Sequence, residues 1–467
     1  MEPEAAGATE QNVVVGRQRN LLTEDLDLPE HVREGVQQLS DSLCAAVERL
    51  ATDLYESECH FLYELVQNAE DAHARARPED SEEPCLTLRL GAPCSSFLHG
   101  YFSSESNEAG FTEGDVTALC GISVSSNMGR KGIGFKSVFA VSDRAHVLSK
   151  GFTFVFDVQG PLGKLGYVTP TWLDGAELST LPAQVRRSHS EGKTVFFLPL
   201  RRAGLASAIS QEMNELASGG RASLLFLRRL RCIELLDQLA SAPRRLQRTG
   251  DTSTASQTAD PLRSCSVILE QQQEPGKVQR QEHRYMVYRH LAAVESEAVQ
   301  SMHVELVLAF PMPSSEEEPE TFSRCEPLFR FLPIRMVGYG FALHCDCFDL
   351  VANRSDLRRG SLPNRVVRDS LPQAFVRACQ ASPHISRRAL ALLGEPVADP
   401  FWKVARECIL EQLSDVSCSS AREEQDLPRL RLGQRTQLLN NVRSLLSELQ
   451  CEGPAASGEH GLRGPTH

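Results

Sequence analysis

The chain has 467 residues, a length typical of two or three domains, and its 49 basic and 61 acidic residues give a formal net charge of −12. This negative charge argues against non-specific binding to nucleic-acid phosphates or to anionic lipid. A composition that is 41% hydrophobic and 24% charged excludes a mostly disordered or a collagenous chain.

The sequence contains no stretch that predicts a membrane segment or a secretory signal. None of its apolar runs approaches the roughly 20 residues that span a bilayer. The first residues, MEPEAAGATEQ, lack the basic start and the apolar region of a signal peptide. We therefore expect no membrane contact and a cytoplasmic or nuclear location, where the scattered cysteines would be free or buried thiols.

The first half of the chain alternates helical and strand-like patterns. Residues 1–30 are polar and are predicted to be disordered. Apolar residues at spacings of three and four predict two helices between residues 30 and 73. Short apolar runs predict strands at 85–90, 152–157 and 194–200, within a first domain at 31–237.

The second half has its own series of strands, followed by helices. An Arg-, Ser-, Thr- and Gln-rich stretch at 238–264 is predicted to be a polar linker. Strand patterns then mark a second domain at 265–362, a helical segment is expected at 363–452, and 453–467 is predicted to be disordered. Strands and helices mix in both halves, which indicates an α/β or α+β chain, and α+β is the class that we expect.

One cluster of possible metal ligands stands out, at His344-Cys345-Asp346-Cys347. A second ligand pair at zinc spacing is missing. Alternating apolar residues around the cluster favour a buried strand over a metal site.

The second predicted helix carries Glu64, Asn68 and Asp71 at spacings i, i+4 and i+7. At about 100° per residue these three side chains share one face of the helix. The pattern alone is also typical of the wet face of any amphipathic helix.

A glycine-rich segment, GRKGIGFKSVF, follows at 129–139. Its glycines allow close approach of the backbone to a ligand, and its successive N–H groups can form an anion nest. Arg130, Lys131 and Lys136 add positive charge to an acidic protein.

In this order, the two signals resemble the N box and the glycine-rich box of the GHKL ATPase superfamily. The resemblance is closest to the sacsin and NO VEIN type of ATPase-like domain, and it covers roughly residues 35–370. Three phrases carry it most specifically, RLATDLYESECHFLYELVQNAEDA, NEAGFTEGDVTALCGIS and GRKGIGFKSVFAVSD. It implies a GHKL (Bergerat-type) α/β sandwich followed by a second α/β domain and C-terminal helices, with ATP and Mg²⁺ as ligands.

The resemblance also implies roles for individual residues. Glu64 would orient or deprotonate the attacking water, Asn68 would bind Mg²⁺ through its side-chain oxygen, and Asp71 would order the site. Arg354 in VANRSDL would reach the terminal phosphate, or else only cap a surface helix. The remaining nucleotide contacts are expected from Ser106, Gly110, Gly129, Lys131, Gly132, Ile133, Gly134, Phe135, Lys136 and Thr194.

The sequence departs from the superfamily pattern in ways that weaken the expected site. The box that normally contributes an aspartate to the adenine amino group has Ser106 in its place, so discrimination of ATP from GTP is expected to be poor. The segment at 123–127 lacks the two lysines common in the sacsin and NO VEIN branch, and the lid is short.

Two functions therefore remain open. One is a slow Mg²⁺-dependent ATPase with a chaperone-like role in remodelling a partner or client protein. The other is a catalytically inactive interaction module that keeps the fold. Intact Glu64, Asn68 and Asp71 favour the first, and the substituted box favours the second.

Overall fold

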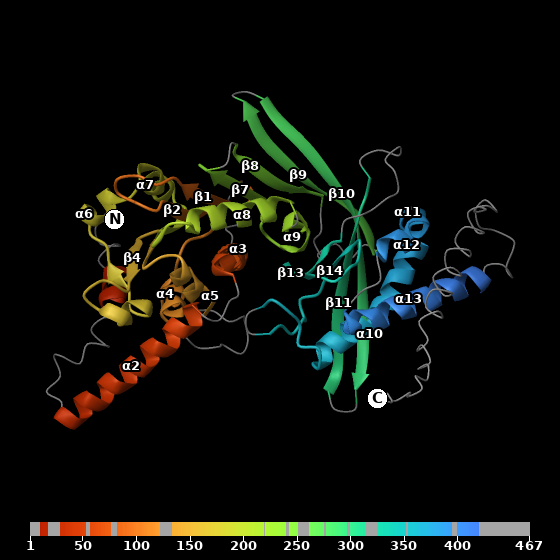
Figure 1. Cartoon of the computed structure of the whole chain (residues 1–467), viewed down its shortest axis with the longest axis horizontal. Helices are drawn as coiled ribbons and strands as arrows, with labels where there is room; N and C mark the ends of the chain where they lie inside the picture. The colour runs from red at the N-terminus through yellow and green to blue at the C-terminus, as the bar shows by residue number, and fades with distance from the viewer. Residues whose placement is uncertain are drawn as a thin grey trace, which may run out of the picture.

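The protein was analysed as a computed structural model. The structure describes residues 10–16, 29–52, 57–75, 82–121, 133–218, 220–239, 242–250, 261–274, 277–296, 299–313, 325–351, 354–394 and 399–419. Both halves of the chain combine helices with strands (Figure 1), which confirms the mixed α+β class.

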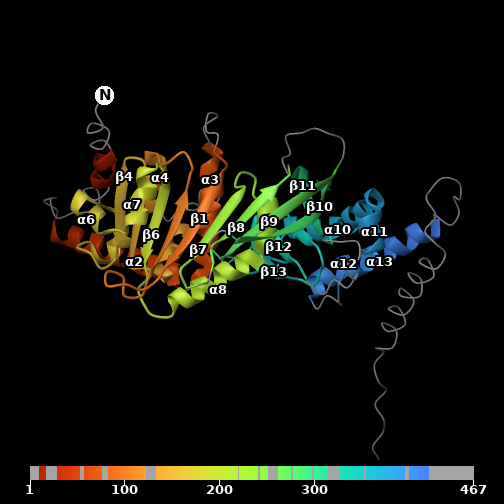
Figure 2. The same ribbon diagram turned by 90° about the horizontal axis from the view of Figure 1, so that it is seen from above.

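One continuous sheet of 14 strands runs through the described part of the molecule (Figure 2), in the order β13-β12-β14-β11-β10-β9-β8-β7-β1-β2-β6-β3-β4-β5. The strands of the first half are β1 (Cys85–Gly91), β2 (Tyr101–Ser106), β3 (Arg144–Ser149), β4 (Phe152–Asp157), β5 (Thr171–Trp172), β6 (Thr194–Pro199) and β7 (Cys232–Asp237). Those of the second half are β8 (Arg244–Thr249), β9 (Leu262–Glu274), β10 (Lys277–Ser296), β11 (Val299–Pro311), β12 (Pro327–Arg330), β13 (Leu332–Met336) and β14 (Ala342–His344).

Helices cover both faces of the sheet in the first half. They are α2 (Glu30–Thr52), α3 (Phe61–Ala72), α4 (Glu113–Cys120), α5 (Ile133–Lys136), α6 (Gly175–Thr180), α7 (Ala183–Ser190), α8 (Leu205–Ser218) and α9 (Ser223–Phe226). Strand β6 shows the layering, because alternate side chains of a strand point to opposite faces. Phe196 and Leu198 join the core beneath α2, α3 and α8, whereas Val195 and Phe197 pack toward α6 and α7.

The second half packs its helices against the long strands β10 and β11 (Figure 1). These helices are α10 (Leu362–Ala381), α11 (Pro383–Arg387), α12 (Ala389–Leu392) and α13 (Pro400–Ser419). Along β11, Leu306 and Leu308 face the core formed with α10 and α13, whereas Val307 and Ala309 belong to the core of the first half. The strand is therefore shared by two hydrophobic cores.

The predicted linker at 238–264 contains a strand. β8 pairs antiparallel with β7 on one side and with β9 on the other. Its sequence, RRLQRT, looks polar because only alternate residues are buried, namely Leu246 and Arg248. The described residues of this stretch thus continue the sheet instead of separating two domains.

The N-terminal stretch also differs in part from its prediction. Residues 10–16, expected to be disordered, are helical, and the Val14 side chain is fully buried in the first core. The rest of 1–28 and residues 420–467, which include the end of the predicted helical segment and the predicted disordered tail, lie outside the described residues.

Candidate functional site

Helix α3 supplies the three polar residues that the sequence places on one face. Phe61, Leu65 and Val66 are buried in the first core and fix the rotation of the helix. Asn68 and Asp71 then line a cavity beside the sheet. Glu64 lies one turn earlier, and its side chain is nearly buried.

The cavity has a volume of about 190 Å³ and is bordered by α3, α4, α5 and the strands β2 and β6. Its walls combine apolar side chains with a small set of carboxylates, amides and hydroxyls, the usual composition of a small-molecule site. The lining residues are Leu65, Asn68, Ala69, Asp71, Ala72, Arg75, Ser104, Ser106, Glu108, Phe111, Asp115, Ala118, Leu119, Phe135, Thr194 and Phe196.

Glu108 is a buried carboxylate of this cavity that the sequence reasoning missed. It accepts a short hydrogen bond from the Thr194 hydroxyl and a second one, of 2.6 Å, from the backbone N–H of Gly110. Thr194 also shares a 2.6 Å hydrogen bond with the Ser149 hydroxyl. The acid stands two residues after Ser106, so a search for a carboxylate at the aligned position alone could not find it.

Ser106 ends β2 and lines the same cavity. Its hydroxyl lies 3.2 Å from Nε2 of His73. Burial, and then the charge of Arg229, lower the pKa of His73 to about 4. The ring that contacts Ser106 is therefore neutral at pH 7.

Two of the remaining predicted residues have structural contacts near the cavity. Gly110 has φ of +81°, and an added Cβ would clash with the side chain of Lys150, so a glycine is required there. Phe135 lines the cavity and packs between Phe139, Phe156 and Phe196.

Of the glycine-rich segment 129–139, which was predicted to bind phosphate, the structure describes residues 133–139. Gly129, Lys131 and Gly132 lie outside the described residues, and Ile133 begins α5. At Gly134 a side chain would clash with the carboxylate of Glu64, so this glycine lets α5 approach α3 closely.

Lys136 does not line the cavity. Its Nζ donates a 2.6 Å hydrogen bond to the carbonyl oxygen of Leu119 near the end of α4, and it lies 4.7 Å from the ring centroid of Phe156. The side chain is almost fully buried, and burial lowers the pKa of its amine to about 7. In this structure Lys136 joins α5 to α4, where the sequence predicted a phosphate contact.

The carboxylate of Glu64 is held from two directions. Nη1 of Arg354 lies 2.7 Å from its Oε1, and Nε2 of His60 lies 3.4 Å from the same oxygen. Burial alone would raise the pKa of Glu64, but the contact with His60 and the charge of Arg354 outweigh it and lower the pKa to about 2. A carboxylate held in this way is a weak base.

Arg354 stands at the tip of a tight loop, with φ of +58°. The loop is closed by the backbone bonds from Val351 N to Asp356 O and from Arg354 N to Val351 O, both 3.0 Å. It is the second half of the chain that brings this arginine to α3, 290 residues away in sequence.

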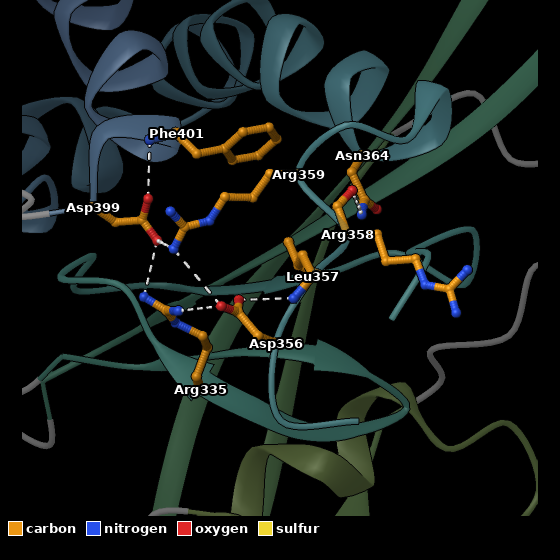
Figure 3. A network of polar contacts seen from close by, with 8 residues as sticks. All are labelled: Arg335, Asp356, Leu357, Arg358, Arg359, Asn364, Asp399 and Phe401. Atoms are coloured by element: carbon orange, nitrogen blue, oxygen red, sulfur yellow. Dashed lines mark hydrogen bonds and ion pairs between the residues drawn. The ribbon is translucent and has the colours of Figure 1, made fainter. Parts of the chain in front are cut away.

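A network of charged side chains fixes the base of that loop (Figure 3). Arg335 of β13 lies 2.8 Å from Asp356 and 2.9 Å from Asp399, and Arg359 lies 3.1 Å from Asp399. Asp399 also accepts from the backbone N–H of Phe401 at the start of α13. The position of Arg354 is thus tied to both β13 and α13.

The opposite end of α3 is anchored by Glu70, which is almost fully buried. Its carboxylate accepts hydrogen bonds from the backbone N–H groups of Arg228, Arg229 and Leu230, at 2.7 to 3.2 Å. The arginine-rich segment FLRRLR thus forms a backbone anion nest around an internal carboxylate.

The His344 cluster agrees with a core strand. Phe341, Leu343 and Cys345 are buried in the second core, and the His344 ring stacks on Phe226 with centroids 4.8 Å apart. Burial lowers the pKa of His344 to about 3. Ligand atoms of Cys345, Asp346 and Cys347 lie within 4.8 Å of one another, and His344 is not part of that group.

Among the described helices, none combines the length and the apolar character that a membrane crossing requires. No protein-family model matches the chain. The chain is similar to Protein NO VEIN of Arabidopsis thaliana, with 28% identity over 351 residues, which make up 72% of this chain and 12% of that protein. The similarity supports a NO VEIN-type relationship, and the chain corresponds to a small part of that much longer relative.

Proposed function

We propose that the chain binds ATP with Mg²⁺ in the cavity beside α3, as a GHKL-type domain does. The observation that carries this proposal is that Asn68, Asp71, Ser106, Glu108 and Thr194, which come from three separate segments of the chain, line one cavity. All of these except Glu108 were expected from the sequence as nucleotide contacts.

The donor set fits the two ligands. Apolar walls that include Leu65, Phe135 and Phe196 suit a flat heterocyclic base, and the buried Glu108–Thr194 pair supplies an acceptor and a hydroxyl for its polar edge. Asn68 and Asp71 offer the hard oxygen atoms that Mg²⁺ prefers. When bound, ATP supplies the phosphoryl group, and Mg²⁺ neutralises charge on the phosphates.

Glu64 is the residue that would act on a water molecule. Its pKa of about 2 makes it a poor proton acceptor while Arg354 stays paired with it. Release of Arg354 toward a phosphate would raise the basicity of Glu64 and place a positive charge where negative charge develops. Any hydrolysis is therefore expected to be slow and limited by separation of this ion pair, and it would support chaperone-like remodelling of a partner protein.

A second function is favoured by two of the same contacts. The ion pair between Arg354 and Glu64 keeps the carboxylate unreactive, and Lys136 points into the core. Both fit a protein that binds nucleotide without hydrolysing it and serves as an interaction module.

Calorimetric titration of the full chain with ATP and Mg²⁺ tests binding. We expect saturable binding that Asn68→Ala reduces at least tenfold, with Gln67→Ala as the control on the same helix. Unchanged binding in Asn68→Ala would place the nucleotide elsewhere and overturn the proposal.

Turnover then separates the two functions. A slow ATPase signal that disappears in Glu64→Gln, with binding retained, supports the enzyme. Binding without any turnover in the unmodified chain supports the interaction module.

A further inference from the structure

A second cavity, of about 330 Å³, lies between the two halves of the chain. His60 and Tyr63 border it from η2 (Glu58–His60) and α3, and Glu212 and Glu215 from α8. The β12–β13 hairpin and the Arg354 loop close the opposite side. None of these residues lines the candidate nucleotide cavity.

Three arginines line this second cavity, and two of them are already neutralised. Arg335 is paired with Asp356 and Asp399 (Figure 3), and Arg354 is paired with Glu64. The side chain of Arg330, at the end of β12, makes no hydrogen bond or ion pair with any residue that the structure describes, and the residue is half-buried.

The surroundings of Arg330 increase the need for a negative partner. Burial, followed by the like charge of Arg354, lowers the pKa of Arg330, and the charges of Asp346 and Asp349 offset only part of this shift. The two α8 carboxylates that line the cavity form no ion pair with Arg330, since Glu212 accepts a 2.7 Å hydrogen bond from Tyr63 and Glu215 is exposed. A half-buried guanidinium that no carboxylate contacts directly is stabilised when an anion joins it.

We propose that this cavity binds a small anion carrying a carboxylate or phosphate group, with Arg330 as its principal contact and Arg354 and His60 as neighbouring donors. The planar guanidinium suits either group through two parallel hydrogen bonds. The acids on α8 make the cavity unsuitable for an extended polyanion, so the ligand is a compact one.

Because of the position of the cavity, binding of an anion there would affect Glu64. Arg354 and His60 line the cavity and also hold the Glu64 carboxylate. An anion that draws either group toward itself weakens its hold on Glu64. This regulatory consequence rests on the proposed function, whereas the binding site itself does not.

Titration of the full chain with inorganic phosphate, and separately with acetate, tests the site and distinguishes the two chemistries. We expect saturable binding of at least one anion in the millimolar range, weakened at least tenfold in Arg330→Gln. Arg289→Gln, at a half-buried arginine of β10 that pairs with Glu305, is the matched control and should leave binding unchanged.

Two further variants and one melting measurement locate the bound anion. Asn68→Ala should lose ATP binding but keep anion binding, and Arg330→Gln should keep ATP binding, so failure of this proposal and of the nucleotide site are distinguishable. The melting temperature of Arg330→Gln should equal or exceed that of the unmodified chain, because a half-buried charge without a hydrogen-bonded partner is removed. Absence of saturable binding of both anions, or binding that Asn68→Ala abolishes, would overturn the proposal.

Discussion

Arg354 donates to Glu64 over 2.7 Å, from a residue 290 positions further along the chain. Both side chains are largely shielded from solvent, so their attraction is only weakly screened by salt. Through this contact the second half of the molecule sets the charge state of a carboxylate in the first half.

Removing the guanidinium should therefore change the acid stability of the protein. The pKa of Glu64 is lowered from an ordinary 4.5 to about 2, so its contribution to the free energy of unfolding is complete above pH 4.5 and is lost as the pH falls toward 2. In Arg354→Gln burial is less opposed and this pKa rises toward 4.5, so the loss of stability on acidification should be smaller than in the unmodified chain. Urea unfolding between pH 3 and pH 7 measures this loss. Arg368→Gln, at an exposed pair with Asp369, should show the unmodified profile, and an identical profile in Arg354→Gln would contradict the expectation.

Burial of Lys136 should make the free energy of unfolding depend on pH in the alkaline range. Its pKa is lowered from 10.5 to about 7, so between these values the unfolded chain binds more protons than the folded one. The free energy of unfolding should consequently rise as the pH increases from 7 to 10. Lys136→Met should remove most of this rise, and Lys403→Met, at an exposed lysine of α13, should retain it. Equal slopes in both variants would show that the amine is not titrating as expected.

Glu108 changes the expectation for nucleotide selectivity. Ser106 alone predicts that ATP and GTP bind about equally, but a buried carboxylate bonded to Thr194 provides the charged acceptor that Ser106 lacks. We expect the full chain to prefer ATP, and Glu108→Gln to lower the ATP-to-GTP affinity ratio about tenfold, or about 1.4 kcal/mol. Competitive titration with both nucleotides measures the ratio. A ratio that falls in Ser106→Ala but not in Glu108→Gln would return the role to the serine.

Glu70 should be one of the most destabilising sites to change. Glu70→Gln replaces an acceptor of three backbone N–H groups by an amide with a single acceptor oxygen. Buried donors left without a partner cost about 1–3 kcal/mol each, so a loss of roughly 3 kcal/mol is expected. Chemical denaturation provides the value, and Glu113→Gln on the exposed first turn of α4 is the control. A loss no larger than that of Glu113→Gln would mean that water replaces the carboxylate.

The sequence was sufficient to predict those strands and helices whose residue pattern lies within the segment itself. The strands at 85–90, 152–157 and 194–200 and the two helices between residues 30 and 73 agree with β1, β4, β6, α2 and α3, because each segment carries its own periodicity. Asn68, Asp71, Ser106 and Thr194, which the sequence predicts as nucleotide contacts, line one cavity.

The sequence was insufficient where contacts with distant parts of the chain decide the structure of a segment or the position of a side chain. β8 has few apolar residues and becomes a strand because β7 and β9 lie on either side of it. Lys136 was expected beside the nucleotide phosphates, but its amine is buried against the carbonyl of Leu119 and the ring of Phe156. Nor can sequence spacing alone show that a loop at Arg354 would meet Glu64.

The pairing of β8 with β7 and β9 also decides how this protein can be divided. A chain cut between 238 and 264 would leave β7 or β9 as an open edge, with a row of backbone donors and acceptors facing water. Such edges recruit strands from other molecules, so the separate halves should aggregate even though each has its own hydrophobic core. Shortened versions of the protein should therefore begin or end outside the sheet, and not at the polar stretch in the middle of the sequence.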